Sequence, residues 1–267
     1  MTKRAVFIGL TYAGTPYALP ECANDAKTNA AYFKLFNKAW DIITIPNASM
    51  DWHDLMDVRA FLAAGDDVLF FYSGHGYRAK DGGKVETGIY TGQAIPHVKL
   101  MQEFFIPILQ TCKQLLRVYD CCYAGSAKKA RGKDGELPMP TIKCLDLGNC
   151  PAPADIEAYK PVNLKNDAVI AACRAKQYAY GAFRGGPGQW GTLDTQQHSL
   201  FSYLFASSLL WRCNISVKMS ADDLAWKCRQ VLNSHPPFRS WKGKDWQIAD
   251  VVNNVNSKFP FDFITRR

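Results

Sequence analysis

The chain has 267 residues, of which 48% are hydrophobic, and carries 32 lysines and arginines against 24 aspartates and glutamates. The apolar content excludes a disordered or fibrous chain, and the length is ordinary for a single α/β domain. Because no apolar run approaches the roughly 18 residues of a membrane span, we expect no membrane partner. The basic start is followed by too short an apolar run for a signal peptide, so that run is interpreted as a first strand.

The nine cysteines form an odd number without regular spacing. A chain of this length needs no disulfides to hold its core, so thiols with individual roles in a reducing compartment are the simpler interpretation. We therefore expect a cytoplasmic protein, and we expect it to be a monomer.

Short apolar runs alternate with segments of helical period along the chain. Strands are expected at 6–10, 41–45, 67–72, 115–119 and 168–172, and helices at 20–36, 52–62, 98–107, 198–212 and 221–233. The helix from about residue 98 should end or kink at Pro107, and Ser220 and Asp223 form a capping-box pattern. This alternation predicts one α/β domain over residues 1–267, with a mostly parallel central sheet and helices on both faces.

Three further segments have the composition of turns and connections. A glycine-rich hairpin is expected at 82–92, and a glycine cluster at 181–191 is interpreted as a rim loop. Residues 126–165, rich in charge and proline, are interpreted as a long, partly mobile surface connection.

Two of the predicted strands end in residues that can carry chemistry. The letters SGHG follow one strand at 73–76, and DCC follows the next at 120–122. In parallel sheets the functional residues lie just past the carboxyl ends of strands, so His75 and a cysteine would lie together as base and nucleophile. A lone histidine or cysteine is more simply a packing residue, but the pair at glycine-flanked strand ends favours a catalytic site.

These segments resemble the motifs of the metacaspases, which are caspase-fold cysteine peptidases. FYSGHG at 71–76 matches the Y-S-G-H-G motif, and YDCCYAGS at 119–126 resembles D-x-C-H-S-G-S, with Tyr-Ala in place of His-Ser. Upstream, IGLTY at 8–12 and LPECANDA at 19–26 resemble I-G-I-N-Y and L-x-G-C-x-N-D-A. The similarity is thinner at 171–174 and weak beyond. The resemblance as a whole implies a caspase-like three-layer sandwich.

The resemblance also implies a Cys–His dyad. Cys122 matches the nucleophile because it lies two positions after Asp120, and His75 matches the acid–base residue. Adjacent side chains on extended backbone point to opposite sides, so Cys121 is expected to face packing. The backbone amides of Gly76 and Cys122 would bind the oxyanion.

An acidic pocket for the residue before the cut is the third implication, with Cys22, Asp25, Ser73 and Asp120 at the matching positions. Cys22 and Asp25 are three apart on one helical face, close to the helix start, where a carboxylate is favourable. Two carboxylates can pair with a guanidinium or ammonium group. We therefore expect peptide or protein substrates that are cut after Arg or Lys, not after Asp.

Calcium is where the sequence departs from the metacaspase pattern. Most members carry acidic segments after the histidine motif, whereas residues 80–87 offer only Asp81 and Glu86. Calcium takes six to eight oxygen ligands, so we expect no metal site, no cofactor and weak or absent calcium dependence. Cys144 and Cys150 have no nearby histidine or C-x-x-C partner, so no zinc loop is expected there. The basic run at 127–133 would suit self-processing, but a solvated charge run explains it equally well.

Two other functions stay open from the sequence. A proteolytically inactive caspase-fold protein could act as a binding or scaffold module, although the intact pair of His75 and Cys122 argues against it. A nucleic-acid-binding protein would fit the net charge of +8. The basic residues are scattered and match no binding motif, so we expect no nucleic-acid partner.

Overall fold

The computed structural model describes most of the first 122 residues and parts of the remainder. The described residues are 1–81, 84–122, 143–146, 166–173, 179–181, 183–184, 196–215, 220, 223–224, 226–227, 230, 247 and 249–253. Among them, no helix has the length and apolar character needed to cross a bilayer.

A central sheet organises these residues. Its strands follow the order β12 (Asp250–Asn253), β9 (Asp167–Ala171), β7 (Gln114–Asp120), β3 (Asp67–Ser73), β1 (Lys3–Gly9) and β2 (Asp41–Ile45). All neighbours are parallel except β12, which pairs antiparallel with β9 at one edge.

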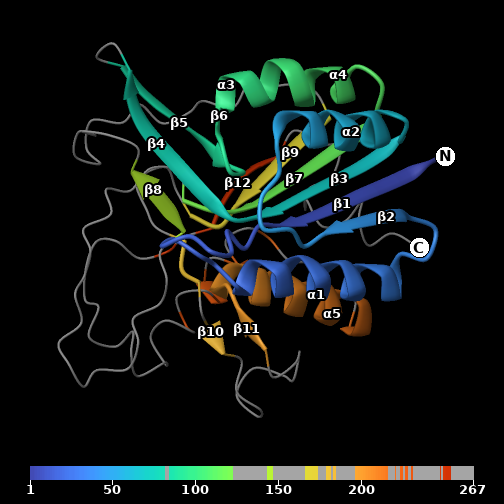
Figure 1. Cartoon of the computed structure of the whole chain (residues 1–267). Helices are drawn as coiled ribbons and strands as arrows, with labels where there is room; N and C mark the ends of the chain where they lie inside the picture. The colour runs from blue at the N-terminus through green and yellow to red at the C-terminus, as the bar shows by residue number, and fades with distance from the viewer. Residues whose placement is uncertain are drawn as a thin grey trace.

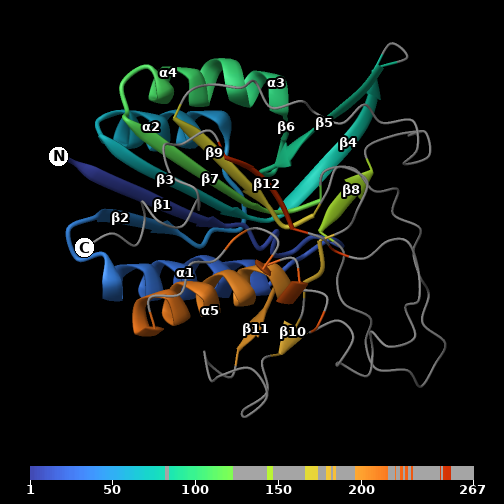
Figure 2. The ribbon, with the colours of Figure 1, turned by 180° about the vertical axis from the view of Figure 1, so that it is seen from behind.

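Helices cover both faces of this sheet. Helices α1 (Glu21–Phe36) and α5 (Leu200–Ile215) lie against one face (Figure 1). The other face is covered by α2 (Trp52–Ala63) and by a run formed by α3 (His97–Lys99), the π-helical segment η1 (Leu100–Phe105) and α4 (Ile106–Leu109), as the reverse view also shows (Figure 2). The prediction of a mostly parallel sheet between two helical layers is confirmed.

Strand β3 shows why the sheet is buried on both faces. All seven of its residues are buried. Phe71 packs toward α1 and α5, with its ring centroid 5.5 Å from that of Phe7 and 5.9 Å from that of Phe205. Phe70 points the other way and contacts Phe105 of η1 at 5.1 Å between centroids. A continuous apolar run of this kind is typical of a strand in a doubly covered sheet.

The predicted hairpin has different bounds. Strands β4 (His75–Asp81) and β5 (Lys84–Tyr90) pair antiparallel, and β6 (Ala94–Pro96) extends this second sheet. The hairpin therefore begins at His75, not at residue 82, because the chain leaves the central sheet directly after β3. The charged residues that alternate along β4 do not form a pattern that predicts a strand.

The helical run does not end at Pro107, but its regular pattern changes beside it, from the π-helical η1 to the α-helical α4. Pro107 occupies the start of α4, directly after η1. Because η1 runs directly into α4, Pro107 lacks an N–H group that the preceding turn would otherwise bind, and the π-helical segment before it interrupts the regular α-helical pattern.

The interpretation of 126–165 as a surface connection is wrong for one short piece. Residues Cys144–Asp146 form β8, which pairs parallel with β4, and the preceding Lys143 is completely buried. The remaining residues of this segment lie outside the described part of the chain. So does most of 181–191, apart from residue 181 and β10 (Phe183–Arg184), which pairs with β11 (Gln197–His198).

The capping box at Ser220 is present. The Asp223 amide donates to the Ser220 hydroxyl at 3.1 Å, and the Ser220 amide donates to the Asp223 carboxylate at 2.8 Å. The predicted helix at 221–233 is described only at residues 223–224, 226–227 and 230, all of which are helical.

Candidate active site

The ends of β3 and β7 lie side by side, with Ser73 opposite Asp120 in the parallel register. Just beyond them, the backbone amides of Gly76 and Cys122 converge on one acceptor. Both donate to the carbonyl oxygen of Lys143, at 3.0 Å from Gly76 and 3.2 Å from Cys122. Two fixed N–H groups aimed at one oxygen are the arrangement that stabilises an oxyanion.

Gly76 has no room for a side chain at this point. A Cβ atom added to it would lie 1.6 Å from the carbonyl oxygen of Cys122. The backbones of the two strand extensions approach each other this closely only because residue 76 is glycine.

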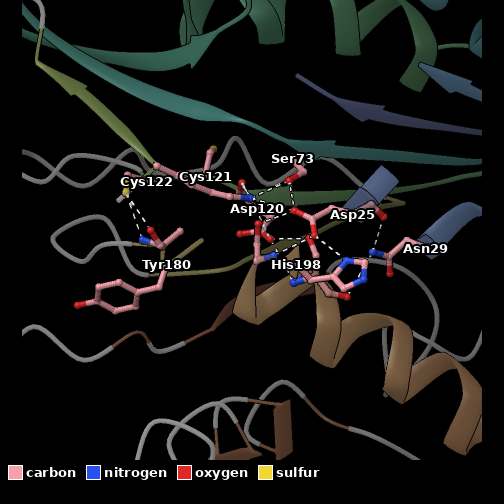
Figure 3. Close-up of polar contacts among 12 residues, drawn as sticks. Asp25, Asn29, Ser73, Asp120, Cys121, Cys122, Tyr180 and His198 are labelled. Carbon is pink, nitrogen blue, oxygen red and sulfur yellow. Dashed lines mark hydrogen bonds and ion pairs between the residues drawn. The ribbon is translucent and has the colours of Figure 1, made fainter. Parts of the chain in front are cut away.

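The tandem cysteines face opposite sides of the sheet. The Cys121 thiol belongs to the core under α2 and η1, and Cys122 belongs to the core under α1 and α5. Figure 3 shows the two side chains leaving the strand in different directions. The sulfur of Cys122 accepts a hydrogen bond from the Ala179 amide at 3.1 Å.

His75 has one ring nitrogen fixed and the other available. Its Nε2 lies 2.6 Å from the carbonyl oxygen of Tyr17, and because a carbonyl only accepts, Nε2 carries the proton. Among the described residues, Nδ1 makes no hydrogen bond of normal geometry, although the Lys143 backbone is near enough to act on the pKa of the ring by raising it. Burial, helped by the nearby Lys143 ammonium, lowers the pKa of His75 to about 4. The ring is therefore neutral near pH 7, with a lone pair on Nδ1 that can accept a proton.

A buried pocket surrounds the side chain of Lys143. Its Nζ lies 3.3 Å from a carboxylate oxygen of Asp25 and 3.3 Å from one of Asp120. The ammonium also donates to the Ser73 hydroxyl at 2.7 Å and to the Asp120 carbonyl at 3.2 Å. Figure 3 shows Ser73, Asp120 and Asp25 turned toward a common point. The structure thus brings these three predicted pocket residues together around a cation.

Charge balance explains the protonation of this pocket. Burial alone would raise the pKa of Asp25, but Lys143, His198 and Ser199 outweigh burial and lower it to about 2. The pKa of Asp120 is raised by burial and by the neighbouring Asp25, against the opposing effect of Lys143. Burial would lower the pKa of Lys143, but the surrounding carboxylates raise it well above its ordinary value. Two buried carboxylates repel each other, so the pocket requires a cation.

The fourth predicted pocket residue, Cys22, forms an apolar part of the wall. Its side chain is completely buried in α1. Burial raises the pKa of the thiol above its ordinary value, although the ammonium of Lys143 acts in the opposite direction. Cys22 therefore stays protonated and contributes no charge.

Helix α5 holds both carboxylates, which the sequence did not indicate. The Ser199 amide donates to Asp25 at 2.9 Å, and the Ser202 amide donates to Asp120 at 3.1 Å. His198 Nδ1 lies 3.2 Å from Asp25 as well. The amides at a helix start favour negative charge, so the start of α5 adds to the stabilisation that Lys143 gives to Asp25. The only signal was a His-Ser pair opening the helix predicted at 198–212.

The two acidic residues considered for calcium lie on the β4–β5 hairpin. Glu86 on β5 accepts a hydrogen bond from the Tyr77 hydroxyl at 2.7 Å. Asp81 lies opposite Lys84 in the hairpin register. Within the described ranges, no group of three or more histidine, cysteine, aspartate or glutamate residues could hold a metal. Asp81 and Glu86 alone do not supply the six to eight oxygens that calcium takes, and weak or absent calcium dependence stays a prediction.

Comparisons with known proteins identify the family of the chain. A family model described as Caspase domain matches residues 2–260. Metacaspase-1 of Plasmodium falciparum (isolate 3D7) is 25% identical over 299 residues, which covers 96% of this chain and 45% of that protein. Metacaspase-2 of Trypanosoma brucei brucei (strain 927/4 GUTat10.1) is 28% identical over 148 residues, which covers 47% of this chain and 42% of that protein. The chain spans less than half the length of these curated relatives.

A solved structure shares the architecture. The crystal structure of caspase-1 from Spodoptera frugiperda matches with a TM-score of 0.57 and 9% identity, covering 96% of this chain and 86% of that one. At this identity the likeness shows the fold alone, and it confirms the caspase-like sandwich. Because the caspase-domain model matches nearly the whole chain, this protein belongs to the caspase-domain family of cysteine peptidases, and its curated relatives are metacaspases.

Proposed function

We propose that the protein is an endopeptidase that cuts after lysine or arginine through a dyad of Cys122 and His75. The observation that carries this proposal is the binding of Lys143. Its ammonium lies between two buried carboxylates, while its carbonyl oxygen accepts from the amides of Gly76 and Cys122. A lysine whose ammonium and carbonyl oxygen are both bound in this way has the position of the substrate residue that precedes a scissile bond.

The chemistry follows from the groups around that carbonyl. Cys122 would transfer its proton to Nδ1 of His75 and attack the carbonyl carbon, and the two amides would stabilise the oxyanion. The protonated His75 would then give its proton to the leaving amine, and water would hydrolyse the thioester. Tyr17 keeps the ring in the required tautomer by accepting from Nε2. No metal or cofactor takes part in these steps.

The proposed specificity is tested with Asp25→Asn. The substitution keeps the shape of the side chain but removes one of the two buried charges that face the substrate cation. We expect kcat/KM for peptides ending in Lys or Arg to fall roughly 100-fold, because one partner of a buried charge pair is lost. The measurement is turnover of three fluorogenic peptides that differ only in a final Lys, Arg or Asp.

Asp57→Asn is the matched control, since Asp57 lies on α2 with its side chain 77% exposed. It should leave the profile unchanged. Preference of the unmodified protein for the Asp-ended peptide would refute the proposed specificity, and failure to cut any of the three peptides would refute the peptidase activity.

The oxyanion site is tested with Gly76→Ala. Because an added Cβ would overlap the Cys122 carbonyl, the two amides must move apart. A displacement of about 1 Å in a catalytic group can cost roughly 100-fold in rate, and we expect kcat to fall by this amount. Gly14→Ala is a useful comparison because an added Cβ there meets no atom within 4 Å, although its φ of +82° carries its own strain. Unchanged kcat in Gly76→Ala would contradict the assignment of the two amides.

A further inference from the structure

Two buried tyrosines bind the backbone of His75 and take no part in the proposed dyad. Tyr12 follows β1 and Tyr72 lies on β3, and their hydroxyl oxygens are 3.0 Å apart. We propose that these two hydroxyls form a clamp that fixes the position of His75, which makes Tyr12 and Tyr72 positioning residues for the acid–base step. This inference rests on the proposed function.

The clamp binds both polar groups of the His75 backbone. The His75 amide donates to the Tyr12 hydroxyl oxygen at 2.9 Å, and the Tyr72 hydroxyl donates to the His75 carbonyl oxygen at 3.0 Å. The Tyr12 hydroxyl in turn donates to the carbonyl oxygen of Tyr90, which lies opposite His75 in the hairpin register. Each hydroxyl has one proton to donate, and this arrangement gives both protons a carbonyl acceptor.

The imidazole ring of His75 is held at separate points from its backbone. The ring centroid of Tyr12 lies 4.7 Å from that of His75, and the Tyr17 carbonyl accepts from Nε2. Burial raises the pKa of the Tyr12 and Tyr72 hydroxyls above their ordinary value, so both stay protonated and keep their role as donors. With backbone and ring both held, Nδ1 keeps one orientation for the transfer of a proton from Cys122.

Tyr12 adopts an unusual backbone conformation in this position. Its φ is 51°, in the left-handed region that bulky residues seldom adopt. The other non-glycine residue with a positive φ among the described ones is Asn166, and asparagine tolerates this region better. The Tyr12 amide donates to the Ala48 carbonyl at 2.9 Å, and the Thr15 amide donates to the Tyr12 carbonyl at 3.1 Å. Strain that the surroundings hold in place is typical of functional sites.

Gly74 leaves room for the two hydroxyls between β3 and β4. A Cβ atom added to it would lie 2.5 Å from the Tyr72 hydroxyl oxygen and 2.6 Å from that of Tyr12. The chain leaves the central sheet at this residue, so the clamp ties the start of β4 to the end of β3 and to the segment after β1. Because Cys122 follows β7 of the same sheet, the clamp fixes the base relative to the nucleophile.

The inference is tested with Tyr12→Phe, Tyr72→Phe and the double variant, which remove only hydroxyl oxygens. A displacement of about 1 Å in a catalytic group can cost roughly 100-fold in rate, and we expect the smaller shift in each single variant to lower kcat for an Arg-ended fluorogenic peptide by about 10-fold. KM should change by less than about twofold, because the carboxylates that bind the substrate are unchanged. Both hydroxyls hold one backbone, so the double variant should lose far less than the roughly 100-fold of two independent effects.

Tyr77→Phe is the matched control. Tyr77 is buried on β4, and its hydroxyl donates to Glu86 at 2.7 Å, so the substitution removes a bonded hydroxyl that does not bind His75. It should leave both kcat and KM unchanged, while thermal melting compares its stability with that of the clamp variants. Hydrogen exchange of the His75 amide should become about 10-fold faster in Tyr12→Phe and stay unchanged in the control.

The outcomes distinguish this inference from the proposed function. Unchanged kcat in both single variants would overturn the inference and leave the peptidase standing, even if both variants melt at a lower temperature. A rise in KM at unchanged kcat, or an equal loss of kcat in Tyr77→Phe, would also overturn it, because the hydroxyls would then serve substrate binding or general packing. Turnover by none of the forms, the unmodified protein included, would refute the proposed function and with it the reaction that the clamp serves.

Discussion

Replacing Cys122 with alanine is expected to lower turnover of Lys- and Arg-ended peptides by at least about 10,000-fold, because in the proposed mechanism the Cys122 sulfur forms the thioester. The substitution removes the sulfur but keeps the backbone amide that donates to the Lys143 carbonyl. It therefore separates the thiol from the oxyanion site, which Gly76→Ala disturbs. The measurement is peptide turnover, with intact mass to follow labelling by an Arg-directed covalent inhibitor.

Cys121→Ala is the matched control for this experiment. Its thiol is equally buried and lies one residue away, but it faces the opposite core. We expect a modest loss of stability, about 1 kcal/mol, with labelling and turnover retained. Labelling that disappears only in Cys121→Ala would show that the nucleophile has been assigned to the wrong cysteine.

The parts of the site that the sequence could predict are those carried by strand ends. His75 and Cys122 follow apolar runs that the hydrophobic pattern of the sequence predicts as buried strands. The parallel register of those strands then places Ser73 beside Asp120. Their local motifs are short and contiguous, so the resemblance to metacaspases could be read directly. Asp25 also lies in a short contiguous motif, within a helix that has a clear apolar stripe, so its place in the site could be predicted too.

The missed residues have no such local signal. Ser199 is 174 positions from the carboxylate that it binds, and Lys143 is 118 positions from the same carboxylate. Ser199 reaches Asp25 only when α5 packs beside α1, and Lys143 does so only when β8 pairs with β4. Strand β8 is short and its segment is rich in proline and charge, so nothing in its pattern indicated a strand. It pairs with β4 through its main chain, which carries no side-chain signature.

Replacing Asp167 with asparagine is expected to destabilise the fold by about 3–5 kcal/mol, because it leaves a buried guanidinium without its counter-charge. The Arg117 and Asp167 side chains are only 3% and 1% exposed. Arg117 Nε donates to Asp167 at 2.9 Å, a second nitrogen of the same guanidinium also bonds this carboxylate, and the group lies 4.9 Å from the ring centroid of Phe105. The measurement is the urea midpoint and slope of unfolding.

Two controls separate the buried pair from ordinary surface charge. Lys113 and Asp66 form an ion pair with side chains 58% and 30% exposed, and Lys113→Ala should cost less than about 1 kcal/mol. The double variant Arg117→Met with Asp167→Leu should recover most of the loss, since apolar residues of similar volume can replace a buried pair. A loss in the double variant as large as in Asp167→Asn would mean that packing around η1, not an uncompensated charge, is what the single substitution disturbs. Because this pair lies under the face of the sheet opposite α5, peptide specificity should stay unchanged in every folded variant of it.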